Sequence, residues 1–343
     1  MPSSTASTVV PTVTLASGLP YPQISFGTGK IFERVPFERA VRLLRAAHAA
    51  GVRAFDVGNY NGMPGVPGIA HADVLFRSAV AEAGIDRADY LHVQKIWNWH
   101  YPVESYTEQL RRHLDRVGAA RADVGVLGSL YDRDIPLAEV VDQVGALIEA
   151  DLLGAWAINN WPAAQAAAVI AEAERQGVRP PEFVQLAYNV VRRAIAEGEP
   201  YQAVFARTGL AVQASVVFQS GLLAGGDGSR DWGSTDPVLD ALAATRDRFA
   251  VAAGGLDTSP ASLALAFVLT NPAEHRLAVI GFSRVEQLDD ALGAFGLLER
   301  VGADQVRAAV ADLWLDRDVT DPHRGVHSDP APLTGPAPVA ETV

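Results

Sequence analysis

The chain has 343 residues, of which 49% are hydrophobic and 20% are charged, so it has ample material for a folded core. Its formal net charge of −12 argues against nucleic acids and anionic membrane surfaces as main partners, because both carry negative charge. The sequence contains no cysteine, which excludes disulfides and thiolate metal sites. No apolar run approaches the roughly 18 residues of a membrane span, and the first residues lack the cationic start of a signal peptide. We therefore expect a soluble, cytoplasmic protein, with an Ala- and Arg-rich composition typical of bacteria.

From residue 24 onward, short apolar runs alternate with longer amphipathic segments. The runs that indicate strands are 24–28, 53–57, 90–95, 123–128, 155–159, 182–187, 210–215 and 277–280. The segments between them that indicate helices are 36–50, 70–83, 103–117, 137–150, 162–176, 200–207 and the longer 236–270. Such an alternation predicts a parallel sheet with helices outside, and about eight units close most simply as a single α/β barrel of the (β/α)8 type, the TIM barrel.

The same pattern predicts the domain organisation. Residues 1–12 are expected to be a disordered N-terminus, and residues 13–315 are expected to form one barrel with an extra helix near residues 303–313. Residues 316–343 form a Pro/Ala-rich C-terminal tail by composition.

Two neighbouring strands end in residues with a clear chemical use. Asp56 ends the run R-A-F-D-V, Lys95 ends V-Q-K, and Tyr60 or Asn61 follows the first of them. Reactive groups of parallel α/β proteins lie at the carboxyl ends of strands. An Asp there would hold the Lys charged, and the charged Lys would stabilise a phenolate and lower the Tyr pKa.

These motifs resemble those of the aldo-keto reductases. The stretch F-D-x-x-x-Y-x-G followed by x-K-I-W is similar to the family pattern, and residues 13–29 resemble the hairpin that closes its barrel floor. The resemblance runs from about residue 13 to about residue 298. It implies an NADP-dependent (β/α)8 enzyme with an Asp-Tyr-Lys-His tetrad, in which Asp56, Tyr60 and Lys95 are catalytic.

The sequence departs from that tetrad at two positions. The family tyrosine lies five residues after the Asp, so a gap-free alignment puts Asn61 there, whereas a one-residue deletion restores Tyr60. The family's D-L-Y-L-I-H corresponds to D-V-G-V-L-G, which puts Gly128 in place of the histidine. His100 is a candidate substitute imidazole, and Trp97 is expected to line an aromatic substrate pocket.

The resemblance also implies a dinucleotide site. W-A-I-N-N-W and V-Q-L-A-Y-N place Asn159, Asn160 and Gln185 where the family holds the nicotinamide carboxamide. F-Q-S-G-L-L-A-G resembles the phosphate-covering turn, with Gly221 and Leu222. The aromatic that stacks on the nicotinamide falls at Ala214 or Ser215.

The segment V-I-G-F-S-R-V-E-Q-L-D-D-A-L resembles the part of the family that binds the adenosine phosphate. Arg284 is the candidate ligand of a 2′-phosphate at a helix start, where backbone N–H groups also favour anions. Gln287 and Asp290 match polar positions of the family, whereas Ala291 replaces the adenine-binding Asn. No residues have the spacing of a metal site.

Three functions follow from these patterns. The first is an NADP-dependent oxidoreductase that reduces the carbonyl of a small molecule by hydride transfer. Because the departures cluster at the redox centre, the second is a barrel turned to non-redox acid–base chemistry such as elimination, isomerisation or cyclisation. The third is a non-catalytic subunit that senses the nicotinamide state. The substrate and the oligomeric state are not encoded in any motif.

Overall fold

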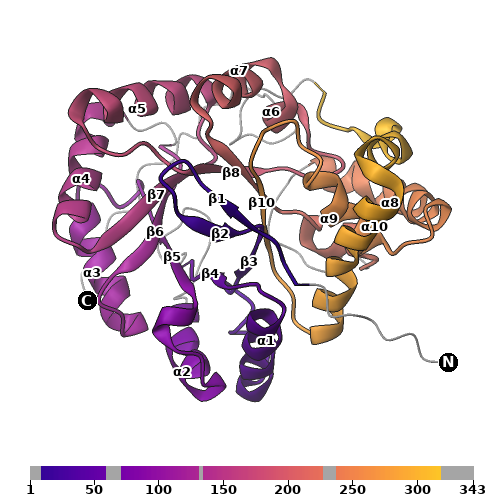
Figure 1. Cartoon of the computed structure of the whole chain (residues 1–343), viewed down its shortest axis with the longest axis horizontal. Coiled ribbons are helices and arrows are strands. Elements are labelled where there is room, and N and C mark those ends of the chain that lie inside the picture. Colours follow the sequence, from indigo (N-terminus) through magenta and orange to yellow (C-terminus); the bar gives the residue numbers. More distant parts are fainter. Residues whose placement is uncertain (1–8, 59–70, 131–133, 227–236, 318–343) are drawn as a thin grey trace.

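The computed structural model describes residues 9–58, 71–130, 134–226 and 237–317. At its centre, parallel strands form a closed barrel in the order β10-β3-β4-β5-β6-β7-β8-β9 (Figure 1). The strands are β3 (Ile24–Gly27), β4 (Ala54–Asp56), β5 (Leu91–Ile96), β6 (Ala122–Leu127), β7 (Leu153–Asn159), β8 (Phe183–Ala187), β9 (Ala211–Ser215) and β10 (Arg276–Ile280). The predicted (β/α)8 barrel is therefore confirmed.

Helices surround the barrel (Figure 1). They are α1 (Phe37–Ala49), α2 (Ala72–Ala83), α3 (Tyr106–Val117), α4 (Leu137–Glu149), α5 (Ala163–Gln176), α6 (Ala194–Glu197), α7 (Glu199–Thr208), α8 (Pro237–Gly255), α9 (Pro260–Val268) and α10 (Val285–Ala309). Short 3-10 turns lie at Arg87–Asp89, Gln219–Ala224 and Ala311–Leu313. None of the described helices is by itself long and apolar enough to cross a membrane, although the bent pair Thr245–Gly255 and Pro260–Val268 meets the criteria of length and composition.

Two helical regions differ from the prediction. The region 236–270 contains two helices because the Ser259 hydroxyl accepts the N–H of Ser262 at 3.1 Å and starts a new helix at Pro260. The four-residue helix α6 is too short to produce helical periodicity in the sequence. The predicted extra helix near residues 303–313 is the part of α10 beyond a kink at Gly302, where φ is 78°, followed by the last 3-10 turn.

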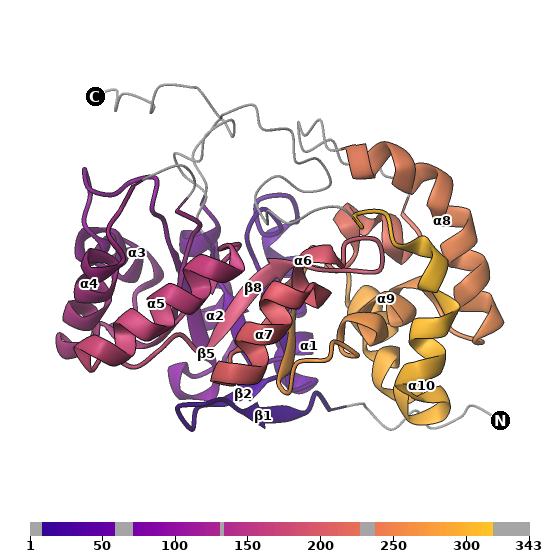
Figure 2. The ribbon, with the colours of Figure 1, turned by 90° about the horizontal axis from the view of Figure 1, so that it is seen from above.

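An antiparallel hairpin of β1 (Thr12–Thr14) and β2 (Pro20–Pro22) lies across one end of the barrel, as predicted (Figure 2). Tyr21 of the hairpin is fully buried, and its ring centroid lies 5.5 Å from that of Phe183 at the start of β8. The hairpin therefore closes the amino-terminal end of the strands. The opposite, carboxyl-terminal end is the mouth at which reactive groups are expected.

The barrel interior is filled by one small apolar cluster, and a larger cluster lies between strands and helices. Many inward residues are small, including Ala54, Ala155, Ala157 and Ala211. Their size leaves room on the inner wall for longer polar side chains from the same strands. The polar side chains that fill this room form the candidate site.

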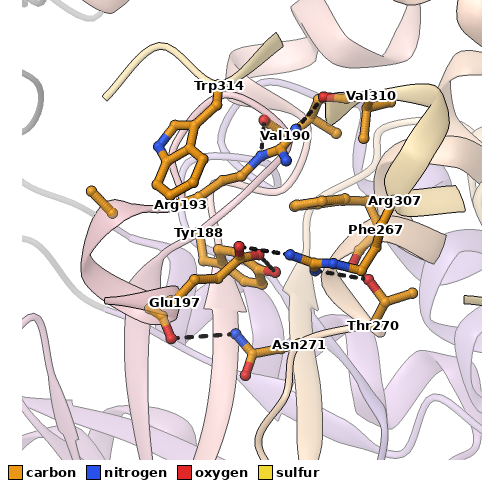
Figure 3. Close-up of polar contacts among 12 residues, drawn as sticks. Tyr188, Val190, Arg193, Glu197, Phe267, Thr270, Asn271, Arg307, Val310 and Trp314 are labelled. Carbon is orange, nitrogen blue, oxygen red and sulfur yellow. Dashed lines mark hydrogen bonds and ion pairs between the residues drawn. The ribbon is translucent and has the colours of Figure 1, made fainter. Parts of the chain in front are cut away.

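Beyond α10, the chain is attached to the loop that follows β8 (Figure 3). Leu315 donates its N–H to the Val191 carbonyl at 3.0 Å, and the Asp316 carboxylate accepts the N–H of Arg193 at 2.7 Å. The Arg193 guanidinium lies 4.5 Å from the centroid of the Phe267 ring. Burial raises the pKa of Asp316 above its usual range. The loop after β8 is thus held from outside by the C-terminal segment.

Candidate active site

Asp56 and Lys95, the two candidates at strand ends, meet on the inner wall of the barrel mouth. Lys95 is 2% exposed, and its Nζ forms an ion pair with Oδ2 of Asp56. The register explains the contact: Asp56 lies opposite Val93, so Lys95 is the next inward residue along β5. Tyr60 and Asn61 lie outside the described residues, so the choice between them stays a prediction.

A buried ion pair of this kind costs desolvation energy and is weak as a stabilising device. Asp56 receives a further hydrogen bond from the Gln185 amide, Nε2 to Oδ2, at 3.2 Å. The carboxylate is therefore held by two donors in a space closed to solvent. Such an arrangement fixes the Lys95 Nζ at a defined place in the mouth.

Three amide side chains form a row beside the ion pair. Asn159, Gln185 and Gln213 occupy matching positions on β7, β8 and β9, because Asn159 pairs with Gln185 and Gln185 pairs with Gln213 in the strand register. The Asn159 amide donates to the Gln185 Oε1 at 2.9 Å, and the Gln185 amide donates to the Gln213 Oε1 at 2.7 Å. Asn159 is partly exposed, whereas Gln185 and Gln213 are buried. We name these three residues the amide row.

Asn160 follows the row with a left-handed backbone, at φ 55°. Its N–H donates to the Gln185 carbonyl at 2.8 Å, and its side-chain Oδ1 accepts the N–H of Ala187 at 3.2 Å. These bonds commit the side-chain oxygen, so a ligand that reaches Asn160 meets its NH2 group. Asn159 and Asn160 together suit the two ends of a carboxamide.

Gly128 stands at the mouth directly after β6, and its side-chain space is taken by Trp97. A Cβ built on Gly128 would lie 2.9 Å from Cζ3 of Trp97 and closer still to Cε3. The Trp97 indole stacks on Trp99 with ring centroids 3.9 Å apart and planes inclined by 19°. A histidine at position 128 is therefore incompatible with the observed position of Trp97.

Hydrogen bonds hold this aromatic side of the mouth in place. The Gly128 carbonyl accepts from Nδ2 of Asn98 at 2.5 Å and from Nε1 of Trp161 at 2.9 Å. The buried Gln109 side chain accepts the N–H of Trp97 at 2.9 Å and donates to its carbonyl at 3.1 Å. The predicted aromatic pocket wall is thus a fixed structure, and its role toward substrate stays a prediction.

His100, the candidate substitute imidazole, lies in the turn after β5. Its ring centroid is 6.0 Å from that of Trp99, with the planes inclined by 56°. The side chain is partly exposed. The structure thus places His100 beside the aromatic wall, and its catalytic role stays a prediction.

The predicted phosphate turn after β9 has an unusual backbone. Val216, Gln219, Ser220 and Gly221 all have positive φ, with values of 56°, 43°, 60° and 97°. A positive φ is costly for a β-branched residue such as Val216 and indicates strain of the kind found at functional sites. Asn189 stabilises the turn, because its Nδ2 donates to the Val216 carbonyl and to the Gln219 Oε1, both at 2.9 Å.

Beside this turn, Leu222 is buried, and so is Ala214, whereas Ser215 is partly exposed; these are the two positions at which the stacking aromatic of the resemblance falls. The Ser215 hydroxyl donates to the Leu186 carbonyl at 2.9 Å. The mouth therefore offers a small polar residue at Ser215, one of the two positions where the sequence lacks the family's stacking aromatic.

The predicted adenosine-phosphate residues lie at the start of α10. Arg284 is exposed at the N-cap position, next to backbone donors that favour anions. The Gln287 Oε1 accepts the N–H groups of Ser283 at 2.9 Å and Arg284 at 3.1 Å, so this side chain caps its own helix. Asp290 has an exposed side chain, and Ala291 is fully buried where the family has a polar residue. Arg284 is therefore the best-placed phosphate ligand of this group.

Together these residues fit a nicotinamide dinucleotide at its carboxamide and phosphate ends. The fit rests on the free carboxamide-facing groups of Asn159 and Asn160, the strained turn, and the exposed Arg284. Among the described residues, no group of three or more His, Cys, Asp or Glu side chains is placed to hold a metal ion.

The fold and the mouth define a class: a (β/α)8 barrel with a buried ion pair and amide groups at the carboxyl ends of its strands. The model of the Aldo/keto reductase family matches residues 23–309, and the chain belongs to this family. Members of the family generally use a nicotinamide cofactor.

The chain is also similar to a protein from Oryza sativa subsp. japonica named "Probable voltage-gated potassium channel subunit beta". The two are 26% identical over 217 residues, which cover 61% of this chain and 64% of the rice protein. The chain therefore matches less than two thirds of the length of that relative.

Sequence reasoning missed several residues of the site. Gln213 gave a signal, because it is a polar residue at an inward position of an apolar strand. Asn98 and Trp161 gave no such signal. Their hydrogen bonds to the Gly128 carbonyl connect the ends of three different strands, which no local sequence pattern shows. Tyr21 and Ser25, at the floor, are connected to the amide row only through the fold.

Proposed function

We propose that the protein is a cytoplasmic, NADP-dependent oxidoreductase that reduces the carbonyl of a small molecule. The observation that carries the proposal is the buried Lys95–Asp56 pair beside an amide row that suits a carboxamide. The family to which the chain belongs supports the same conclusion. The bound nicotinamide would supply a hydride to the carbonyl carbon.

The side chains at the mouth then have separate tasks. Asn159 and Asn160 would hold the carboxamide, the turn with Gly221 and Leu222 would cover the phosphates, and Arg284 would bind a 2′-phosphate. Lys95, kept charged by Asp56, would lower the pKa of the acid at Tyr60, which gives its proton to the carbonyl oxygen.

The replacement of the histidine limits the substrate. A donor aimed at a developing oxyanion typically contributes about 10²–10³ in rate. Gly128, which is covered by Trp97, has no side chain to donate such a hydrogen bond. We therefore expect the substrate carbonyl to be intrinsically reactive. Trp97, whose indole stacks on Trp99, would line the pocket for its non-reacting part.

A second candidate is a non-catalytic subunit that senses the nicotinamide state. It is favoured by the similarity to the rice protein, whose name describes a channel subunit, and by the missing imidazole. A third, non-redox acid–base chemistry at Lys95, follows if no dinucleotide binds. Measurements of dinucleotide binding and of carbonyl turnover distinguish these three functions.

The first test is a titration of the protein with NADPH and NADH, followed by nicotinamide fluorescence. We expect saturable binding with a preference for NADPH. Arg284→Ala should weaken NADPH binding by roughly tenfold, the typical value of a charged hydrogen bond, and leave NADH binding unchanged. Arg300→Ala is the matched control, because it removes the same charge from an exposed position near the other end of the same helix, and its NADPH affinity should stay as in the native protein. No binding of either dinucleotide would remove both the reductase and the sensor.

The second test assigns the acid. In a screen of small carbonyl compounds with bound NADPH, Tyr60→Phe should abolish turnover and Asn61→Ala should not. The opposite result would place the acid elsewhere.

A further inference from the structure

Near the end of the described chain, residues 314–316 contact the loop that follows β8. We name residues 314–316 the C-terminal anchor and residues 188–193 the β8 loop. Asp316 of the anchor is 4% exposed, and its carboxylate accepts the N–H of Arg193 at 2.7 Å and that of Ala194 at 3.2 Å. These N–H groups lie at the start of α6, whose own N-cap residue provides no capping side chain. The anchor therefore supplies this cap from a distant part of the chain.

Further contacts connect the anchor to the β8 loop. Leu315 donates its N–H to the Val191 carbonyl at 3.0 Å. The Trp314 ring lies 5.8 Å from the Arg193 guanidinium, which donates to the Val310 carbonyl at the end of α10 (Figure 3). The β8 loop is thus held by backbone, carboxylate and aromatic contacts with the end of the chain.

The β8 loop in turn holds the turn after β9, which is predicted to cover the phosphates and which we name the phosphate turn. The fully buried Asn189 accepts the N–H groups of Val191 at 3.0 Å and Arg192 at 3.1 Å with its Oδ1. Its Nδ2 donates to the Val216 carbonyl and to the Gln219 Oε1, both at 2.9 Å. Asn189 therefore uses its oxygen for the β8 loop and its NH2 for the phosphate turn.

Arg192 makes a second link between the two segments, because its Nε donates to the same Gln219 Oε1 at 3.0 Å. Both side chains are buried. The phosphate turn needs such support, since Val216, Gln219 and Ser220 all have positive φ. A backbone in this conformation persists only where the surrounding structure fixes it.

We infer that the C-terminal anchor is a positioning element for the phosphate turn: it fixes the β8 loop, and the β8 loop holds the turn in the shape that covers the phosphates of the dinucleotide. Asp316 is its central residue and acts through the β8 loop without touching the cofactor. The inference rests on the proposed function, because it concerns how the cofactor is bound.

The first test measures NADPH affinity after a change in the anchor. Asp316→Ala should weaken NADPH binding roughly fivefold, a typical effect of a substitution in such a network. Asp316→Asn keeps an acceptor oxygen for the N–H of Arg193 and should bind NADPH as the native protein does. Asp312→Ala is the matched control, because Asp312 lies in the preceding 3-10 turn with an exposed side chain paired to Arg248, and its affinity should stay native.

A double-variant cycle distinguishes positioning from a purely stabilising role. Gln219→Met keeps the length of the side chain but removes the acceptor that links the phosphate turn to the β8 loop, so it should also weaken NADPH binding roughly fivefold. Combined with Asp316→Ala, it should weaken binding little further, because both changes break the same link. Asp316→Ala combined with Arg284→Ala should instead multiply the single effects, because Arg284 acts at the start of α10.

The outcomes separate the inference from the proposed function. If the native protein binds neither NADPH nor NADH, the proposed function fails and the inference fails with it. If the native protein binds NADPH and Asp316→Ala binds it equally well, or multiplies the effect of Gln219→Met, the anchor only stabilises the fold and the inference alone is overturned. Should Asp316→Ala not fold, Trp314→Phe removes the indole donor of the Asp316 carboxylate with a smaller change. Weaker NADPH binding by that variant supports the inference, and an unaltered affinity overturns it.

Discussion

The two sides of the barrel mouth are built on different principles. On the side of β4, β5 and β8, charged and amide groups are buried together, with Lys95 and Asp56 joined by an ion pair and supported by Gln185. On the side of β6, a glycine without a side chain is covered by the indole of Trp97. The first side is a buried cluster of charged and amide groups, and the second is a packed aromatic wall.

The two sides of the mouth are held by separate sets of contacts. The ion pair and the amide row are connected to each other and to the floor, so a change at one member disturbs the others. The Trp97–Gly128 contact depends instead on the loop after β5 and on Asn98. The hydrogen bonds of the first side therefore do not include the Trp97–Gly128 contact.

The largest expected effect comes from breaking the ion pair. Lys95→Met would leave the Asp56 carboxylate buried without its counter-charge, which typically costs about 3–5 kcal/mol of unfolding free energy. Urea unfolding measures this loss. Lys95→Met combined with Asp56→Asn should recover a large part of it, because no charge is then buried. A double variant as unstable as the single one would contradict the account of this side.

A smaller effect is expected from filling the space at Gly128. Gly128→Ala forces Trp97 away from its stack on Trp99 and should cost about 1–3 kcal/mol, as overpacking does. Thermal unfolding measures the loss. Gly254→Ala is the control, because a Cβ there meets no heavy atom within 4 Å and the unfolding free energy should not fall.

A double variant tests the contact between Trp97 and Gly128. Trp97→Leu combined with Gly128→Ala should be less destabilised than the sum of the two single changes. Strict additivity would show that Trp97 does not occupy the space of the missing side chain.

His92 lies on the same strand as Lys95 but faces the helices, outside the barrel mouth. Burial, with the nearby Arg87, lowers its pKa from 6.5 to about 4. Between these values the unfolded chain binds a proton that the folded chain does not, so stability is present above pH 6.5 and is lost as the pH falls.

The pH effect is measured by urea unfolding at pH 7 and pH 5. The native protein should lose about 2 kcal/mol more than His92→Leu over this range. An equal loss in both proteins would assign the acid sensitivity to other groups.

Much of the fold was predictable because strand and helix periods are local properties. The eight strands follow from apolar runs, and the meeting of Asp56 with Lys95 follows from the rule that reactive groups lie at strand ends. The floor hairpin, Asn159 and Gln185 were indicated instead by the resemblance to the aldo-keto reductases.

The remaining features depend on register and on contacts between loops. Gln213 joins Gln185 only because β8 and β9 pair in a particular register, which their sequences do not specify. The covering of Gly128 by Trp97 depends on the shape of the loop after β5. The splitting of 236–270 into two helices required the cap at Ser259, and the capping role of Gln287 competes with the ligand role that the motif indicates.

We predict that the protein transfers hydride from bound NADPH to a carbonyl compound without an imidazole at position 128. The most direct measurement follows oxidation of bound NADPH by a panel of reactive aldehydes, ketones and sugars in the native protein and in Lys95→Met. The account predicts substrate-dependent oxidation by the native protein and a loss of at least about tenfold in Lys95→Met, when both bind NADPH. Tight NADPH binding by the native protein with no oxidation by any carbonyl of the panel would contradict it and favour the sensing subunit.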